Sequence, residues 1–297
     1  MADFIERVAA FDEMPLAVVV GCGDMGMGTA RALGRRHPLL VVDIDPERLD
    51  QAVRALRTEG YVVSGFRCDI ADPDQVAALG ASLAAGPGVR VLAHVAAIGS
   101  ASCSWRQVMQ VDLVGVHLVV RALEPSFVRG AVAVLISSTG SYLCPRDPEL
   151  DRLLDEPLRP DFLDALVARL GHEPDFLEAY FMAKQGVNRL ARTLAVAWGE
   201  REIRVLSVSP GLIDSTMGRT GGAALPVYDA AETGRRLGSR SEKARKEVPL
   251  GRQGRLPEVV AAIDFAASDA ASFLSGIDIP VDGGSTAKWR LAGLSDR

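Results

Sequence analysis

Cysteine and histidine are scarce in this sequence of 297 residues, which contains four of each. Cys22, Cys68, Cys103 and Cys144 are scattered, and neither a C-x-x-C pair nor a cluster of histidines occurs. We therefore expect neither a disulfide scaffold nor a bound metal. This usage of cysteine is typical of proteins in a reducing compartment.

An excess of positive charge and a long apolar run are also lacking. Lys and Arg number 33 against 38 Asp and Glu, for a formal net charge of -5, so we expect no nucleic-acid partner. No apolar run approaches the roughly 20 residues of a membrane span, so we expect no membrane partner. Asp3, Glu6 and Asp12 distinguish the N-terminus from a signal or transit peptide. The expectation is a cytoplasmic protein.

Short β-branched runs alternate with longer helical stretches along the chain. Many of the runs are apolar throughout, which is typical of strands buried on both faces of a parallel sheet. The pattern predicts an α/β fold: a Rossmann-like, doubly wound parallel sheet with helices on both faces, as a single domain over residues 1–297. Strands are expected at 16–20, 39–43, 61–64, 90–95, 132–137, 203–208 and 277–281, and helices at 25–36, 47–57, 74–84, 105–123, 178–198 and 257–267.

Two stretches interrupt this alternation. Residues 143–176 are charged and contain several prolines, and residues 215–250 are rich in Gly and Arg. Both would follow carboxyl ends of strands, where open α/β sheets bind ligands. We interpret the first as a helical insertion and the second as a substrate lid.

A glycine-rich loop follows the first expected strand. Gly21, Gly23 and Gly26, with Asp24 and Met25 between them, open the first helix, where a tight turn and the helix N-terminus favour a pyrophosphate. Asp43 ends the next strand, about 20 residues on, where a carboxylate accepts hydrogen bonds from a ribose. Its charge favours NAD over NADP, although Arg36 and Arg48 keep NADP open. The same loop also resembles that of S-adenosylmethionine-dependent methyltransferases, which this segment alone does not exclude.

Tyr180 and Lys184 are four residues apart within the helix expected at 178–198. Residues at this spacing lie on one helix face. An ammonium held near a phenol favours the phenolate, which makes Tyr180 a candidate proton donor and acceptor.

The order of motifs along the chain resembles the short-chain dehydrogenase/reductase family. After the glycine loop come Asp69-Ile70, Ser137-Ser138, Tyr180 with Lys184, and the segments 209–214, 251–258 and 281–284. The resemblance covers about residues 15–285. It implies an NAD(P)-dependent enzyme that interconverts a secondary alcohol and a ketone.

The resemblance also implies catalytic roles. Tyr180 would exchange a proton with the substrate oxygen, and Lys184 would favour the Tyr180 phenolate and bind the nicotinamide ribose. Ser138 would hold the substrate oxygen, with Ser137 and Ser141 as neighbouring candidates. Asp112 stands where the family has an Asn that holds a water next to the Lys. Its charge would partly offset the effect of Lys184 on Tyr180.

Further positions would contact the cofactor. Asp69 and Ile70 would border the adenine, and a small residue at Ala96 would allow close approach of the dinucleotide. The nicotinamide and the phosphates would be positioned by Pro210, Gly211, Ile213 and Ser215.

Some features depart from the family pattern. Cys22 stands where the first Gly of the family's loop is expected, and His94 stands in the segment that usually carries Asn; we interpret His94 as structural. The long segment before Tyr180 resembles the insertion of the 3α-hydroxysteroid dehydrogenase/carbonyl reductase subset. In this chain, Val167, Leu170 and Phe176 of that segment would offer an apolar face to a partner subunit. A homodimer or homotetramer is expected.

Apolar residues of the expected lid favour a bulky, hydrophobic alcohol or ketone such as a steroid, terpenoid or fatty derivative. The altered positions Asp112 and His94 leave a second function open, a catalytically weak NAD(P)-binding regulator on the same scaffold.

Overall fold

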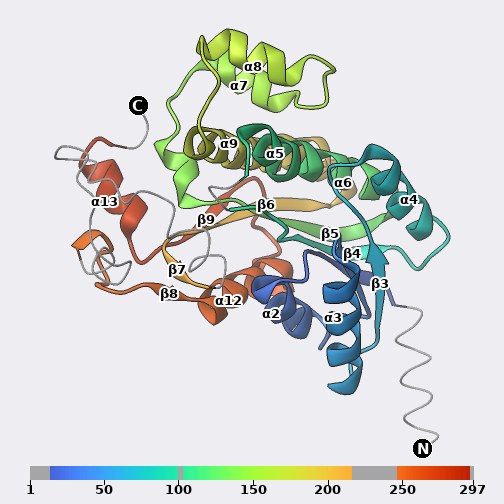
Figure 1. Ribbon diagram of the computed structural model, residues 1–297. Coiled ribbons are helices and arrows are strands. Elements are labelled where there is room, and N and C mark those ends of the chain that lie inside the picture. Colours follow the sequence, from blue (N-terminus) through green and yellow to red (C-terminus); the bar gives the residue numbers. More distant parts are fainter. Residues whose placement is uncertain (1–13, 100–102, 216–245, 295–297) are drawn as a thin grey trace, which may run out of the picture.

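The computed structural model describes residues 14–99, 103–215 and 246–294, and a parallel sheet forms its centre (Figure 1). The strands lie in the order β3-β2-β1-β4-β5-β6-β9, and every neighbouring pair is parallel. Their bounds are Leu16–Val20 (β1), Leu39–Asp43 (β2), Val63–Arg67 (β3), Val89–His94 (β4), Phe127–Ile136 (β5), Arg204–Pro210 (β6) and Asp278–Val281 (β9). The Rossmann-like fold predicted from the sequence is confirmed.

Helices cover both faces of the sheet (Figure 1). Along β1, Ala17 and Val19 pack into one apolar cluster while Val18 and Val20 pack into the other, because successive side chains of a strand point to opposite faces. This explains why β1 and residues 39–42 of β2 are all apolar. One face carries α4 (Pro73–Leu83), α5 (Trp105–Met109), α6 (Gly115–Leu123) and α9 (Phe176–Ala197); the other carries α2 (Asp24–Leu33), α3 (Pro46–Thr58) and α12 (Leu256–Ala267).

Aspartate followed by proline starts several of these helices. The side chains of Asp45, Asp72 and Asp147 accept hydrogen bonds from backbone N–H groups of the first turns of α3, α4 and α7 (Pro148–Asp155). Proline in the first turn loses nothing, since its missing N–H would have no partner within the helix. Local sequence chemistry thus determines where the chain turns from strand to helix.

Shorter elements complete the chain. They comprise a π-helical segment η1 (Gln110–Val114), the 3-10 turns η2 (Glu124–Ser126), η3 (Thr139–Leu143), η4 (Gly199–Arg201) and η5 (Asp269–Ala271), the paired strands β7 (Ile213–Asp214) and β8 (Gly254–Arg255), and α13 (Ser285–Leu291).

Helices α7 (Pro148–Asp155) and α8 (Phe162–Leu170) lie within the stretch 143–176 and form an outer layer over α5 and α9 (Figure 1). Val167, Leu170 and Phe176 pack against the chain's own apolar cluster, which includes Leu150 and Leu166. These three side chains are partly buried by this packing, and their expected contact with a partner subunit stays a prediction. Most of the expected lid, residues 216–245, lies outside the described residues.

Several elements differ from the sequence expectation; β5, for example, begins at Phe127 rather than at residue 132. The third strand begins at Val63 rather than Tyr61 and continues to Arg67; Tyr61 precedes the strand and lies beside Gly34. The helix expected at 105–123 contains the π-helical segment η1 in its middle, and that segment carries Asp112.

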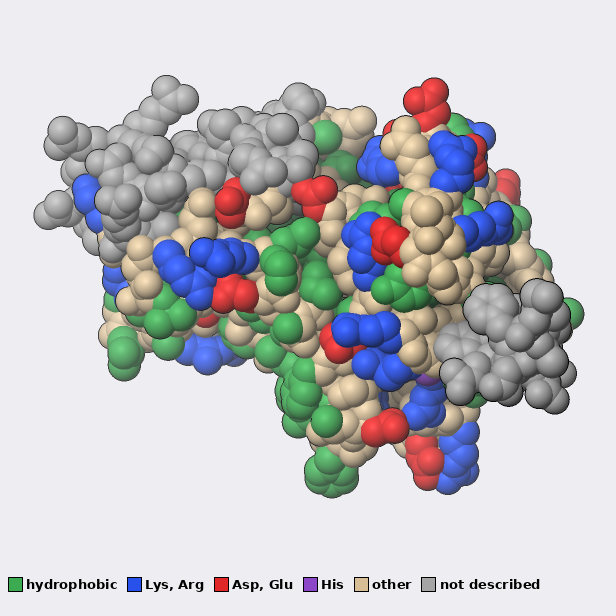
Figure 2. Space-filling model, turned by 90° about the horizontal axis from the view of Figure 1, so that it is seen from below, with side chains coloured by type: hydrophobic (Ala, Val, Ile, Leu, Met, Phe, Trp, Pro, Cys, Tyr) green, Lys and Arg blue, Asp and Glu red, His purple; other side chains and the backbone are tan. Residues whose placement is uncertain are grey.

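The face formed by α2, α3 and α12 intersperses basic, acidic and apolar side chains (Figure 2). Ion pairs such as Arg31–Glu59 and Arg36–Asp264 link neighbouring elements there. None of the described helices is long and apolar enough to cross a membrane.

Candidate active site

The carboxyl ends of the strands bring the predicted site residues to one edge of the sheet. Gly21 follows β1, Asp43 ends β2, Ala96 follows β4, Ser138 follows β5 and Pro210 ends β6. Because all these strands are parallel, their carboxyl ends meet at the same edge. The strand order reverses between β1 and β4, and this is where open α/β sheets bind ligands.

The glycine loop after β1 is shaped by close backbone approach. Gly21 has a φ of 101°, and a Cβ there would lie 2.8 Å from the backbone N of Ala96. A Cβ on Gly26 would lie 1.7 Å from the carbonyl oxygen of Gly21, so both positions require glycine. Gly23, by contrast, has open space around it and caps α2 without a side-chain hydrogen bond. The first-turn amides of Asp24, Met25 and Gly26 therefore suit a pyrophosphate.

Cys22 does not obstruct this loop. Its side chain is buried in the apolar cluster on the sheet face that α2, α3 and α12 cover, and Sγ lies 3.8 Å from the carbonyl oxygen of Val42. Burial, reinforced by the charge of Asp43, raises the pKa of the thiol to about 12. The thiol is a neutral, inward-facing group, and the cysteine leaves the solvent side of the loop free.

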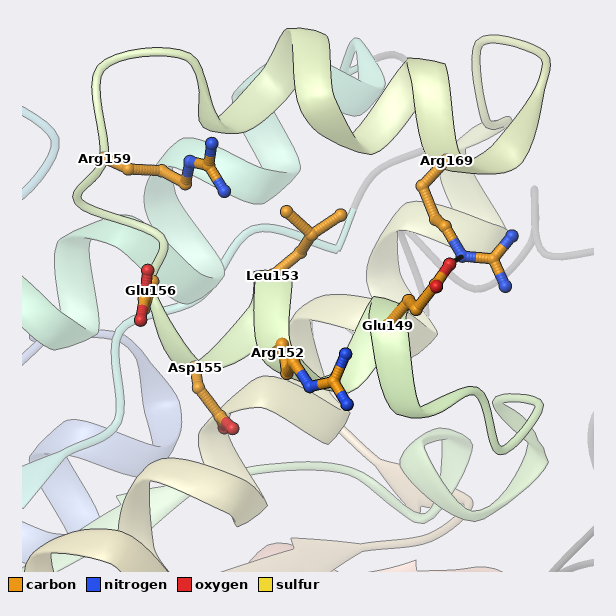
Figure 3. Close-up of a pocket in the computed structure, with 7 residues that line it drawn as sticks. All are labelled: Glu149, Arg152, Leu153, Asp155, Glu156, Arg159 and Arg169. Atoms are coloured by element: carbon orange, nitrogen blue, oxygen red, sulfur yellow. Dashed lines mark ion pairs between the residues drawn. The ribbon is translucent and has the colours of Figure 1, made fainter.

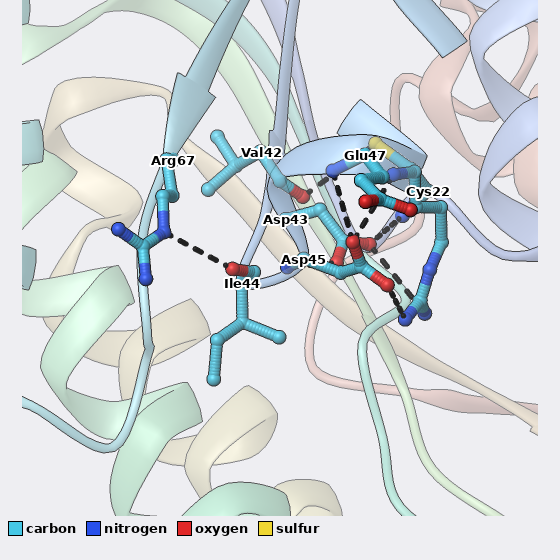
Figure 4. Close-up of polar contacts among 8 residues, drawn as sticks. Cys22, Val42, Asp43, Ile44, Asp45, Glu47 and Arg67 are labelled. Atoms are coloured by element: carbon cyan, nitrogen blue, oxygen red, sulfur yellow. Dashed lines mark hydrogen bonds and ion pairs between the residues drawn. The ribbon is translucent and has the colours of Figure 1, made fainter. Parts of the chain in front are cut away.

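Asp43 is buried and held in place by the protein (Figure 4). Oδ2 accepts a hydrogen bond from Cys22 N at 2.7 Å, and Oδ1 accepts one from Asp45 N at 2.9 Å. Arg48 approaches Oδ2 at 3.9 Å and pairs with Asp45 at 3.0 Å. A carboxylate has about four acceptor positions, so Asp43 retains capacity for a ribose hydroxyl.

The remaining cofactor candidates lie along the same edge. Asp69 Oδ1 accepts a hydrogen bond from Ala71 N at 2.9 Å. Ile70 is buried against Gly115, and a Cβ added to Gly115 would lie 2.9 Å from the Ile70 side chain. Gly211 N donates to Val281 O at 3.0 Å. Ile213 is buried in β7 and Ser215 follows that strand half-buried.

Lys184 and Asp112 form a buried ion pair. Nζ of Lys184 lies 3.0 Å from Oδ2 of Asp112, with exposed side-chain fractions of 1% and 0%. Oδ1 of Asp112 accepts from Ile98 N at 2.8 Å. Burial alone would lower the pKa of the Lys184 ammonium, but the charge and hydrogen bond of Asp112, together with the Tyr180 side chain, raise it on balance. Asp112 thus contacts Lys184 directly, where the sequence interpretation had placed a water.

Tyr180 lies one turn before Lys184 on α9. Nζ of Lys184 is 5.5 Å from the centre of the Tyr180 ring, and the Phe176 ring stacks with the Tyr180 ring, with centroids 6.2 Å apart. The structure therefore brings Tyr180, Lys184 and Asp112 together. A half-buried phenol beside a buried, fully charged ammonium is suited to proton exchange.

His94 lies fully buried at the end of β4. Burial, followed by the charge of Lys184, lowers its pKa to about 3, so the imidazole is neutral at physiological pH. A neutral buried side chain of this kind agrees with the structural role expected for His94.

Ser138 caps the 3-10 turn η3, and its Oγ accepts from Gly140 N at 3.2 Å. Ser141 Oγ donates to the Ser138 carbonyl at 2.7 Å, while Ser137 Oγ donates to the Lys184 carbonyl at 2.8 Å. Asn188 Nδ2 donates to Ser141 Oγ at 2.9 Å, which joins the turn to α9. Sequence reasoning missed Asn188, although it follows Lys184 by four residues and so shares its helix face.

A separate hollow lies between α7 and α8 (Figure 3). It has a volume of about 530 Å³ and lies in the outer layer, away from the strand ends. Arginines and acidic residues share its wall, namely Arg152, Arg159, Arg169, Glu149, Asp155 and Glu156, together with Leu153. This mixture favours no single charge of ligand, and we place the active site at the strand ends. Among the described residues, no group of His, Cys, Asp and Glu is arranged to hold a metal ion.

Known proteins share both the sequence pattern and the fold. The sequence profile of a family described as enoyl-(acyl carrier protein) reductase matches residues 23–146 and 167–286. The cis-4-hydroxycyclohexanecarboxylate dehydrogenase of Sinomonas cyclohexanicum is 32% identical over 288 residues, which cover 94% of this chain and 98% of that protein. The galactitol 2-dehydrogenase (L-tagatose-forming) of Cereibacter sphaeroides is 28% identical, covering 91% and 94%.

Solved structures agree with this. The citronellol catabolism dehydrogenase of Pseudomonas aeruginosa PAO1 superimposes with a TM-score of 0.65 at 26% identity, covering 93% of this chain and 96% of that one. Levodione reductase gives a TM-score of 0.70 at 24% identity, covering 93% and 99%, and supports the fold.

These matches separate the chain from the methyltransferases that share its glycine loop. Spanning nearly its whole length, they establish that the chain belongs to the short-chain dehydrogenase/reductase family, whose members use NAD or NADP, and that it is an oxidoreductase acting on CH–OH groups.

Proposed function

We propose that the protein is an NAD(H)-dependent oxidoreductase that interconverts a secondary alcohol and a ketone on a bulky, largely hydrophobic substrate. The observation that carries this proposal is the contact between the buried Lys184 ammonium and the Tyr180 ring, at the strand edge that also carries the glycine loop. A protein that only bound a dinucleotide would have no need for this arrangement.

Each catalytic candidate then has a role. The Ser138 hydroxyl would hydrogen-bond the substrate oxygen, and Tyr180 would take the alcohol proton during oxidation and return it during reduction. Lys184 would stabilise the phenolate electrostatically, and Asp112 would hold Lys184 and moderate its charge. A bound nicotinamide would supply hydride transfer.

The loop and strand ends would hold the dinucleotide. The pyrophosphate would be held by Gly21, Gly23 and the first-turn amides of α2. Two observations support this placement: the space around Gly23 is open, and no side chain caps α2. Asp69 and Ile70 would border the adenine. The nicotinamide half would lie near Ala96, Pro210, Gly211, Ile213 and Ser215.

Asp43 supports NAD over NADP, because a buried carboxylate repels a 2′-phosphate. We expect Asp43→Ser to lower the preference for NAD over NADP by at least about tenfold, measured as the ratio of kcat/KM values. Asp50→Ser, on the outer surface of α3, is the control and should leave the ratio unchanged. An unaltered ratio in Asp43→Ser would assign the discrimination to another group.

The names of the relatives guide the choice of substrate. A cyclic alcohol bearing a carboxylate, a terpenoid alcohol and a polyol are represented among them. We propose a cyclic or terpenoid secondary alcohol, and a panel with cis-4-hydroxycyclohexanecarboxylate, a terpenoid secondary alcohol and galactitol would rank these classes by kcat/KM. Homodimers or homotetramers, which sedimentation would distinguish, remain our expectation.

The decisive experiment compares the protein with its Tyr180→Phe variant. Loss of the proton-transfer group should lower turnover by about 100-fold or more while NADH binding, followed by fluorescence, is retained. NADH binding by the unaltered protein without turnover of any alcohol would instead identify a regulator. Turnover retained by Tyr180→Phe would assign the proton transfer to another residue.

A further inference from the structure

A carboxylate at the start of β9 collects hydroxyl groups from elements far apart in the sequence. Asp278 Oδ2 accepts from Tyr142 Oη at 2.6 Å, and Oδ1 accepts from Ser207 Oγ at 2.7 Å and Ser209 Oγ at 2.9 Å. Both serines are fully buried on β6. None of the motifs discussed above includes Tyr142 or Asp278.

Tyr142 belongs to η3, the turn that Ser138 caps. On one side, Asn188 of α9 holds this turn through Ser141, whose hydroxyl donates to the Ser138 carbonyl. On the other side, Tyr142 connects the turn to Asp278 and thereby to β6 and β9. The turn is consequently fixed between the helix of Tyr180 and the two last strands of the sheet.

The Tyr142–Asp278 hydrogen bond has the properties of a firm attachment. A hydroxyl that donates to a carboxylate makes a charge-assisted bond, which is shorter and stronger than one between neutral groups. Burial, followed by the bond to Asp278 and the charge of that residue, raises the pKa of the Tyr142 phenol above its ordinary value. The phenol therefore remains protonated and able to donate. Arg290 lies over the ring, with Cζ 5.1 Å from its centre.

We propose that Tyr142 and Asp278 are positioning residues, which hold the η3 turn so that the Ser138 hydroxyl faces the substrate oxygen together with Tyr180. Neither touches the substrate in this proposal, and both act through Ser138. The inference rests on the proposed function, because it assigns Ser138 to the reacting oxygen. It adds a requirement that the family motifs do not contain.

Tyr142→Phe tests the attachment, since it removes one hydroxyl and keeps the ring. Tyr61→Phe, distant from the site beside Gly34, is the matched control. Amide hydrogen exchange of residues 138–143 reports on the turn whether or not a substrate is known. Turnover is then measured per NADH-binding site titrated by fluorescence, so that a loss of folded protein does not mimic a loss of rate.

We expect faster exchange of 138–143 in Tyr142→Phe alone. We also expect kcat per site to fall between about 10- and 100-fold with little change in KM for NADH, as a small misplacement of a reacting group can produce. Asp278→Asn, which keeps an acceptor oxygen, should retain more turnover than Asp278→Ala.

Unchanged exchange in Tyr142→Phe would overturn the attachment. Faster exchange with unchanged kcat would show that the attachment does not serve the reaction, and equal losses in Asp278→Asn and Asp278→Ala would reject the role of the acceptor oxygen. If the unaltered protein binds NADH but oxidises no alcohol, the proposed function fails and the catalytic part of this inference fails with it. The exchange experiment would still decide whether Tyr142 holds the turn.

Discussion

Two cationic side chains of helix α9 form ion pairs, one buried in the interior and one partly exposed to solvent. Lys184 and Asp112 meet at 3.0 Å with exposed side-chain fractions of 1% and 0%. Arg189 lies five residues further along, 25% exposed, and pairs with Asp151 at 2.8 Å and Asp155 at 2.6 Å. The first pair faces the sheet and the second holds α7 against α9.

The comparison shows that burial decides what an ion pair does. Charges attract more strongly in the poorly polarisable interior than at the surface, but bringing them there costs much of that attraction. The inner pair therefore adds little net stability while making each partner dependent on the other. The outer pair is screened by solvent and acts as a modest mechanical link.

The largest effect should follow from Lys184→Met. This change leaves the Asp112 carboxylate buried without its cation, and breaking a buried pair in this way costs about 3–5 kcal/mol of unfolding free energy. Urea denaturation at pH 7 measures the loss. The loss should shrink as the pH falls, because the stranded carboxyl then takes up a proton in the folded state.

Two controls sharpen this prediction. Lys246→Met alters an exposed lysine and should change the unfolding free energy by less than about 0.5 kcal/mol. The double variant Asp112→Asn/Lys184→Met removes both charges and should recover at least half of the loss. A loss below about 1 kcal/mol in Lys184→Met would contradict the importance of the buried pair.

A smaller effect is expected for Asp112→Asn. Asparagine retains an oxygen for Ile98 N but removes the charge that offsets the Lys184 ammonium beside Tyr180. Removal of this charge alters the electrostatic environment of Tyr180, and the pH–rate profile for alcohol oxidation should therefore change. Asp155→Asn alters the outer pair and should leave the profile in place. An unchanged profile in Asp112→Asn would remove Asp112 from the mechanism.

Much of the fold was predictable because its signals are local. The apolar residues of β1 and residues 39–42 of β2 indicate burial on both faces of the sheet, and Asp45-Pro46 marks a helix start. The third strand was placed inaccurately because it lies at the edge of the sheet. There Ser64 and Arg67 are exposed, which weakens its apolar pattern.

The candidate site was predictable only in part. The proximity of Tyr180 and Lys184 follows from spacing on one helix. The direct pairing of Lys184 with Asp112 depends on how η1 packs against α9, and a position in the sequence does not reveal that contact. Tyr142 and Asp278 are 136 residues apart, and neither carries a local signal that connects them.

The smallest effect should follow from Arg189→Met. Asp155 loses both of its hydrogen bonds, at 2.7 and 2.6 Å, whereas Asp151 retains one from Gln185 at 2.6 Å. Because these carboxylates are partly exposed, water replaces the lost partner, and unfolding free energy should fall by about 1 kcal/mol or less. Turnover should be unchanged, and the loss should disappear in 1 M NaCl owing to screening. Arg189→Lys, which keeps the charge but not the planar fork, should recover part of the stability. A loss as large as that of Lys184→Met would mean that exposure does not separate the two pairs, and the contrast between them would no longer hold.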